Sequence, residues 1–95
     1  MLPNFLQTAL WSYDLKKMTK NRYKNLIITQ ILNFGDWQQL QWLLQNYSAK
    51  EIKKVLKNPA RGMWRADVIN YWEKIFNIRI AKSKVLKALW PPYAK

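Results

Sequence analysis

The spacing of apolar residues constrains the fold more than any other feature of this sequence. Aliphatic and aromatic residues recur at steps of three and four along most of the chain. That spacing gathers apolar side chains on one face of an α-helix, whereas a half-buried strand needs alternation with period two, and no segment alternates over a useful length. The two glycines and four prolines are also few for a loop-rich sheet protein. The sequence predicts an all-α protein, and its 95 residues leave room for one small domain.

The first half of the chain contains two expected helices. A short one begins at Pro3, which suits a first helical turn, and stops near Asp14. A longer one is expected over about residues 20–34, with Thr19 as its N-cap and Gly35 directly after its C-terminus. Because this second helix is apolar over a broad face, we expect it to lie at the centre and to be contacted from several sides.

Three further helices have clear start or stop signals. Asp36 is expected to cap the first, and Ser48 opens the second through a capping box in which Glu51 reaches back to it. Asn58-Pro59 closes that helix, and the last strong helix spans about 64–77. The residues expected to face the core are Leu40, Leu43, Leu44, Tyr47, Ile52, Val55, Leu56, Val68, Ile69, Ile75 and Phe76. We therefore expect a compact bundle of about five helices.

The six tryptophans fall into two groups by their expected surroundings. Trp37, Trp42 and Trp72 lie within apolar helical stretches, where we expect them to fill the core rather than to stack on bases. Trp11 and Trp64 lie near helix ends, where we expect partial exposure. The sixth tryptophan belongs to the C-terminal segment.

The composition changes after Ile78, where basic and apolar residues interleave up to Pro91-Pro92. We expect a helical domain over residues 1–78 and a basic amphipathic tail over residues 79–95. The tail has three interpretations: it docks in a partner's groove, it packs on its own domain, or it is a disordered arm that binds nucleic acid. The residues expected to contact a partner are Lys82, Leu86, Leu89 and Trp90.

The net charge points to the class of partner. Seventeen Lys and Arg residues outnumber five Asp and Glu residues, which gives a formal net charge of +12. The natural partners of so basic a chain are nucleic acid, an acidic protein surface or an anionic bilayer. No apolar run approaches the ~18–20 residues of a membrane-spanning helix, and the first residues lack the charged region of a signal peptide. We therefore expect a cytoplasmic protein that no membrane anchors, with attachment of the basic C-terminal segment to a membrane surface as a minor alternative.

Four lysines share one side of the helix that Ser48 opens, and the apolar residues of that helix point the opposite way. The stripe consists of Lys50, Lys53, Lys54 and Lys57. Like charges at this spacing repel one another, and a phosphate backbone would relieve that repulsion. The alternative is an ordinary solvated lysine face.

The order helix, short turn, helix also occurs in a helix-turn-helix unit. In that interpretation the positioning helix, the turn and the recognition helix are residues 48–58, 59–63 and 64–77. Two arginines then flank the start of the recognition helix, where a phosphate would lie, and an outward asparagine can read adenine. Besides the lysine stripe, the expected nucleic-acid contacts are Arg61, Arg65, Asn70 and Lys74. The alternative is two packed helices of an ordinary bundle, which have the same order.

Residues suited to catalysis are few. The chain has no cysteine and no histidine, which excludes disulfides and thiolate metal sites and removes the usual imidazole base. The five acidic residues are scattered along the sequence, and no glycine-rich phosphate loop is present. We expect no enzymatic activity, no metal and no cofactor.

A set of short motifs extends over residues 2–78. The segments are Leu2-Pro3, Trp11 to Asp14, Ile27 to Asp36, Trp42-Leu43, Ile52 to Leu56 and Tyr71 to Ile78. Together they resemble a family of small, uncharacterised bacterial helical proteins (DUF6922). Such proteins are often encoded beside nucleotidyltransferase-type toxins, so the resemblance implies an antitoxin with a toxin as its protein partner.

These observations combine into one expected function and one alternative. The expected function is a non-catalytic, antitoxin-like protein that binds nucleic acid, DNA rather than RNA, represses its own operon and contacts a toxin. The alternative is a protein-interaction module whose basic surface matches an acidic protein partner, without nucleic acid. The sequence leaves the oligomeric state open.

Overall fold

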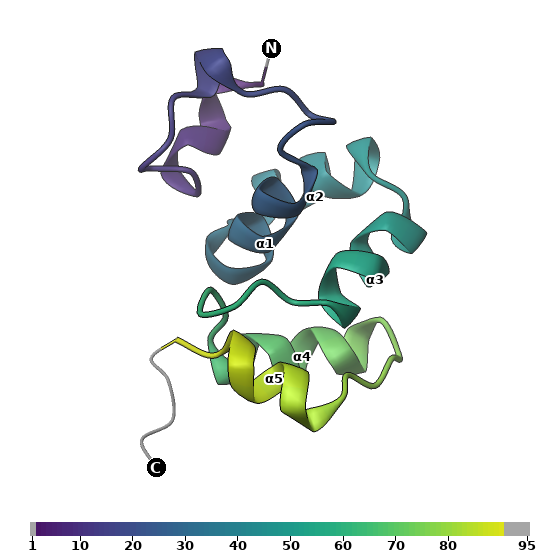
Figure 1. The fold of residues 1–95 in the computed structure, drawn as a ribbon. Helices are drawn as coiled ribbons and strands as arrows, with labels where there is room; N and C mark the ends of the chain where they lie inside the picture. The colour runs from purple at the N-terminus through teal and green to yellow at the C-terminus, as the bar shows by residue number, and fades with distance from the viewer. Residues whose placement is uncertain (1, 91–95) are drawn as a thin grey trace.

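The computed structural model describes residues 2–90, which form five α-helices and two short 3-10 helices and contain no strand (Figure 1). The 3-10 helices are Asn4–Thr8 and Leu15–Lys17. The α-helices are α1 (Lys24–Phe34), α2 (Trp37–Asn46), α3 (Ala49–Lys57), α4 (Ala66–Ile75) and α5 (Lys82–Ala88). The all-α prediction is confirmed.

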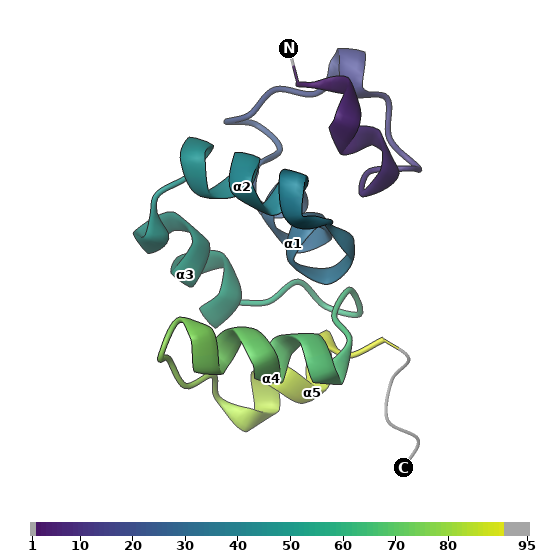
Figure 2. The same ribbon diagram turned by 180° about the vertical axis from the view of Figure 1, so that it is seen from behind.

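Helix α1 lies at the centre of the molecule, as its broad apolar face predicted. It packs against α2, α3 and α4, and Ile27, Ile28 and Ile31 on it are buried. The indole N–H of Trp72 on α4 donates to the Leu32 carbonyl over 2.9 Å, which fixes α4 against α1. Figure 2 shows the N-terminal segment at one end of the molecule and the α4–α5 pair at the other. The long dimension of 40 Å runs between these ends.

Helix α1 begins four residues later than predicted. The Thr19 hydroxyl accepts the Arg22 N–H over 3.3 Å, so it caps a turn over 20–23 and not the helix itself. The Lys20 carbonyl, which a longer helix would use internally, instead accepts the Tyr47 hydroxyl over 2.8 Å. The residues before α1 therefore form a turn that is joined to the end of α2.

The local start signals of α2 and α3 are confirmed. Asp36 and Gln39 form a capping box at α2, and Ser48 and Glu51 form one at α3. Gly35 ends α1, but not in a left-handed conformation, since its φ is −73°. A side chain at this position would lie 2.6 Å from the Ile31 carbonyl oxygen. Glycine is needed here because the backbone approaches closely.

Several expected core residues lie elsewhere. Trp37, Leu44 and Ile75 are exposed, contrary to the prediction, with 69%, 51% and 55% of their surfaces open. Helices α2 and α4 are peripheral, so each buries a narrower stripe than its apolar residues could fill. Trp64 was expected to be partly exposed because it lies near a helix end. It precedes α4, yet it is fully buried. Trp11 is exposed, as expected near a helix end.

The residues of the expected tail that the structure describes, 79–90, share the core of the helical domain. Ile80, Ala88 and Leu89 are buried. The Trp64 N–H donates to the Ala88 carbonyl over 2.8 Å, and the Trp90 N–H donates to the Trp64 carbonyl over 2.7 Å. Of the three interpretations of the tail, packing on its own domain describes residues up to Trp90. The remainder of the expected tail, including Pro91-Pro92, lies outside the described residues.

A tight turn directs α5 back along α4. Asn77 has a left-handed φ of 53°, and the Ile78 N–H donates to the Glu73 carbonyl over 3.0 Å, as in the common glycine-type helix stop. The Glu73 carboxylate then accepts the Ile80 N–H over 2.9 Å. This turn brings the basic residues of α5 onto the body of the domain.

Replacing Asn77 with glycine should stabilise the protein. Glycine adopts positive φ without the steric cost that a side chain carries, so we expect Asn77→Gly to raise the free energy of unfolding by about 0.5–1 kcal/mol. Asn77→Ala should lower it by a similar amount. Urea denaturation of the three proteins measures both effects, and equal midpoints would show that the turn is not strained.

Candidate nucleic-acid interface

The lysine stripe of α3 is present as predicted. The capping box sets the start of the helix, and the buried side chains of Ile52, Val55 and Leu56 hold one face against the core. The opposite face carries Lys50, Lys53, Lys54 and Lys57, of which Lys53 is partly buried and the others are exposed.

Helix α5 adds a second set of basic residues beside this stripe. The Lys84 ammonium donates to the Asn58 side-chain oxygen over 2.8 Å, at the C-terminus of α3. The Gly62 N–H donates to the Lys87 carbonyl over 3.1 Å, which places α5 along the connection that carries Arg61. We call the surface formed by these elements the α3–α5 basic surface. Its residues are Lys50, Lys53, Lys54, Lys57, Arg61, Lys84 and Lys87.

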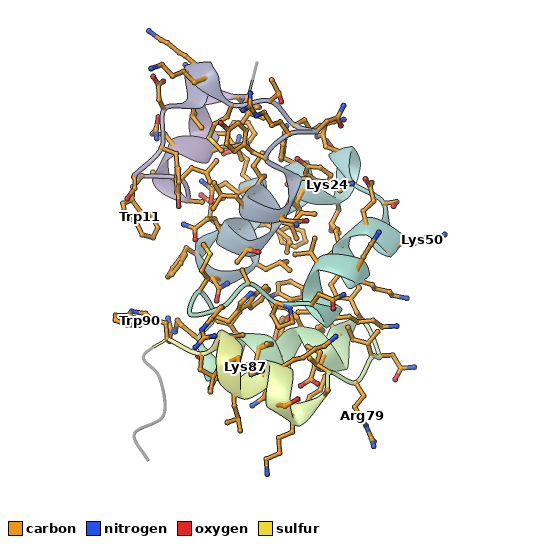
Figure 3. All side chains as sticks on the ribbon, in the orientation of Figure 1. Trp11, Lys24, Lys50, Arg79, Lys87 and Trp90 are labelled. Carbon is orange, nitrogen blue, oxygen red and sulfur yellow. The ribbon has the colours of Figure 1, made fainter. Side chains whose placement is uncertain are left out.

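Figure 3 shows how these elements lie. Lys50 projects from α3 on one side of the molecule, and Lys87 lies on α5 towards the middle of the same view. Sequence reasoning missed the contribution of Lys84 and Lys87. The apolar spacing of Val85, Ala88 and Leu89 predicts which side of α5 is buried, but it does not say which helix lies alongside.

The acidic residues do not neutralise this surface. Four lie outside the surface: Asp14 accepts from the Lys16 N–H, Asp36 from Gln39 and Glu73 from Ile80, while Asp67 pairs with Arg65. Glu51 lies on α3 itself, but its carboxylate accepts from Ser48 and pairs with Lys24, which is not one of the stripe lysines. Among residues 2–90, only Lys24 and Arg65 form ion pairs with a carboxylate. The surface therefore presents uncompensated positive charge.

A hollow of about 400 Å³ lies beside this surface, between the start of α1 and α3. Its lining includes Lys24, Lys50, Lys54 and Glu51. The pKa of Glu51 lies below its usual value, chiefly because the Ser48 N–H donates to the carboxylate and also because the Lys24 ammonium does, over 3.1 Å. Glu51 is therefore ionised near neutral pH, and three lysines against one carboxylate leave the hollow positively charged.

The helix-turn-helix interpretation finds less support in the geometry. The connection between α3 and α4 spans residues 58–65 and not 59–63, and α4 covers 66–75 and not 64–77. Gly62 turns this connection with a φ of +70°. Helices α3 and α4 remain in contact, but the connection between them is longer than the predicted turn.

Helix α5 also lies against the expected reading face of α4. Asn70 is exposed, but the hollow beside it is also lined by Leu86 of α5 and by Leu89 directly after α5. Lys74 is exposed and lines a second hollow with Asn70. A duplex groove would therefore meet α5 as well as α4.

The remaining predicted site residues lie as follows. Arg65 is exposed and pairs with Asp67 over 3.2 Å. In α5 and just after it, Lys82, Leu86 and Trp90 are exposed, whereas Leu89 is 4% exposed and faces the core. Leu89 is thus not open to a partner, contrary to the expected exposed surface.

The described part of the chain offers no cluster of acidic residues that could hold a metal ion. Over the same residues, none of the helices has the length and apolar character needed to span a bilayer.

Comparison with known proteins identifies one family. The model of a family of unknown function (DUF6922) matches residues 5–56. The matched segment begins in the first 3-10 helix and ends in α3, so it includes three of the stripe lysines, while α4 and α5 lie beyond it. Neither the curated proteins nor the solved structures contain a match to the chain.

Proposed function

The chain belongs to the family of unknown function DUF6922, and we propose that it is a non-catalytic protein that binds nucleic acid through the α3–α5 basic surface. One observation carries this proposal. The basic residues of α3, of the following connection and of α5 lie on elements that hydrogen bonds hold side by side, and none of these residues pairs with a carboxylate within residues 2–90. A polyanion would relieve the repulsion among them.

The chemistry of the surface favours contacts to phosphate. A lysine ammonium is a point charge, and contacts to phosphate fix the position of a protein on nucleic acid without reading the bases. Binding should therefore depend on salt more than on sequence. The candidate base contact, Asn70, lies beside α5 and not on the basic surface.

The antitoxin role adds a second partner, and the sequence offers a separate surface for it. No Lys or Arg occurs between residues 25 and 49. Within that stretch, α2 exposes Trp37 and Leu44. A protein partner bound to this uncharged face would leave the basic surface free for nucleic acid. We propose that the chain acts as an antitoxin with both contacts, and repression of its own operon follows if the bound site is its promoter.

The test of nucleic-acid binding is the salt dependence of the affinity. Replacing Lys53, Lys54 and Lys57 together with glutamine removes three phosphate contacts, each worth about 0.9 in the slope of log K against log salt for a duplex and about 0.7 for a single strand. We expect the slope to become shallower by roughly 2 to 3. Fluorescence anisotropy with a labelled oligonucleotide at several salt concentrations measures it.

A matched control has the same change in charge at another place. Lys16, Lys17 and Lys20 lie in the segment before α1, outside the α3–α5 basic surface. Replacing these three with glutamine should change the slope much less. Equal slopes for the two triple variants would refute the assignment of this surface. No binding to any oligonucleotide at low salt would favour the acidic protein partner instead.

A further inference from the structure

Three exposed aromatic residues lie at one edge of the molecule. Trp11, Phe34 and Trp90 have 58%, 45% and 63% of their surfaces open. The Trp11 ring meets the Phe34 ring edge to face, with centroids 5.0 Å apart and an interplanar angle of 78°. This contact orients the Trp11 ring while more than half of its surface remains open. Figure 3 shows Trp11 and Trp90 on the same side of the molecule.

Two hydrogen bonds connect the segment that carries Phe34, the ring partner of Trp11, to Trp90. The Arg65 N–H donates to the Asn33 side-chain oxygen over 3.2 Å, which joins the end of α1, where Phe34 lies, to the start of α4. The residue before Arg65 accepts the Trp90 N–H over 2.7 Å. Phe34, Arg65 and Trp90 are therefore held on adjoining segments.

The aromatic edge continues the α3–α5 basic surface. Lys87 belongs to that surface and precedes Trp90 by three residues, and its carbonyl is bonded to the connection that carries Arg61. The order across the molecule is the lysine stripe of α3, then Lys84 and Lys87, then Trp90. A ligand that follows the basic residues from α3 along α5 arrives at the exposed indole of Trp90.

The chemistry of this arrangement distinguishes between forms of nucleic acid. In a duplex the base faces are stacked on one another, whereas an unpaired base offers its face to an aromatic ring. Proteins that bind single strands combine a basic track along the backbone with aromatic side chains on which bases stack. We propose that the ligand of the α3–α5 basic surface is single-stranded nucleic acid, with bases stacked on Trp90 and Trp11. This inference rests on the proposed function, because the lysines supply its phosphate contacts.

Single-strand preference and base stacking can be measured together. Anisotropy with oligothymidine, oligouridine and a duplex of equal length compares the ligands at one salt concentration. We expect both single strands to bind more tightly than the duplex, and the stronger of the two identifies DNA or RNA. Each lost stack should weaken single-strand binding about 5- to 150-fold. Trp11→Ala and Trp90→Ala should therefore each reduce single-strand affinity and leave duplex affinity unchanged.

The control is an exposed tryptophan in another place. Trp37 on α2 is 69% exposed. Trp37→Ala removes the same side chain as Trp11→Ala and Trp90→Ala, and it should leave single-strand affinity unchanged. Trp90→Phe retains a stacking face and should recover most of the loss. Circular dichroism verifies that each variant is folded.

The two proposals fail in different ways. Equal affinity for duplex and single strand, with no effect of Trp11→Ala or Trp90→Ala, overturns the single-strand inference while the lysine variants still weaken binding. A protein that binds no nucleic acid at low salt overturns both proposals. Loss of single-strand binding in Trp37→Ala as well would overturn the assignment of bases to the Trp11–Trp90 edge.

Discussion

Trp64→Ala should destabilise the protein by about 3–5 kcal/mol, the range typical of removing a large buried side chain. Trp64 has no exposed surface, so its removal leaves a cavity that the surrounding helices can fill only in part. Because a domain of this size has a total stability of roughly 5–15 kcal/mol, this single change should leave the chain close to unfolding. Urea or thermal denaturation followed by far-UV circular dichroism measures the loss.

Two further variants test whether the loss of stability in Trp64→Ala comes from the cavity. The Trp64 indole N–H is buried and has no hydrogen-bond partner, so Trp64→Phe removes an unsatisfied donor while retaining an aromatic ring. Its cost should be clearly smaller than that of Trp64→Ala. Trp37→Ala at an exposed position should stay within roughly 0.5 kcal/mol of the native protein. A Trp64→Ala protein as stable as Trp37→Ala would show that Trp64 is not a core residue.

The features that the sequence predicted well are local ones. A capping box involves residues three apart, so Ser48 and Glu51 together specify where α3 begins, and Asp36 with Gln39 does the same for α2. The lysine stripe follows from helical spacing once that start is set. The all-α class follows from the same periodicity. None of these predictions required knowledge of how the helices pack.

The features that the sequence did not predict depend on contacts between distant segments. Trp64 precedes a helix, a position typical of partial exposure, yet it is buried, and its backbone is bonded to residues 88 and 90. Trp37 has the spacing of a core residue but lies on a peripheral helix. The basic surface shows the same division: the α3 stripe was predictable, whereas Lys84 joins it only through a hydrogen bond to Asn58, 26 residues away.

A chain that ends at Ile78, the boundary that composition suggests, should lose its cooperative fold. The missing segment supplies the buried side chains of Ile80, Ala88 and Leu89 and the backbone partners of Gly62 and Trp64. Burial of a large aliphatic side chain contributes about 1.5–3 kcal/mol, and removing the segment would also remove the hydrogen bonds to the backbone of the buried Trp64. We therefore expect a loss greater than that of Trp64→Ala. Near-UV circular dichroism of the tryptophans and a thermal melt measure it.

Substituting either of two leucines, one in α5 and one directly after it, tests the structural role of this segment in the full-length chain. Leu89 is 4% exposed and Leu86 is 45% exposed, in the same short segment. Leu89→Ala should cost about 2–5 kcal/mol, as other buried leucines do, and Leu86→Ala much less. Such a difference would establish that α5 is a structural part of the domain, and that its lysines are held beside α3 by the core. A cooperative melt with an unchanged midpoint in the chain ending at Ile78 would instead make α5 an appendage, and Lys84 and Lys87 would then have no fixed place on the basic surface.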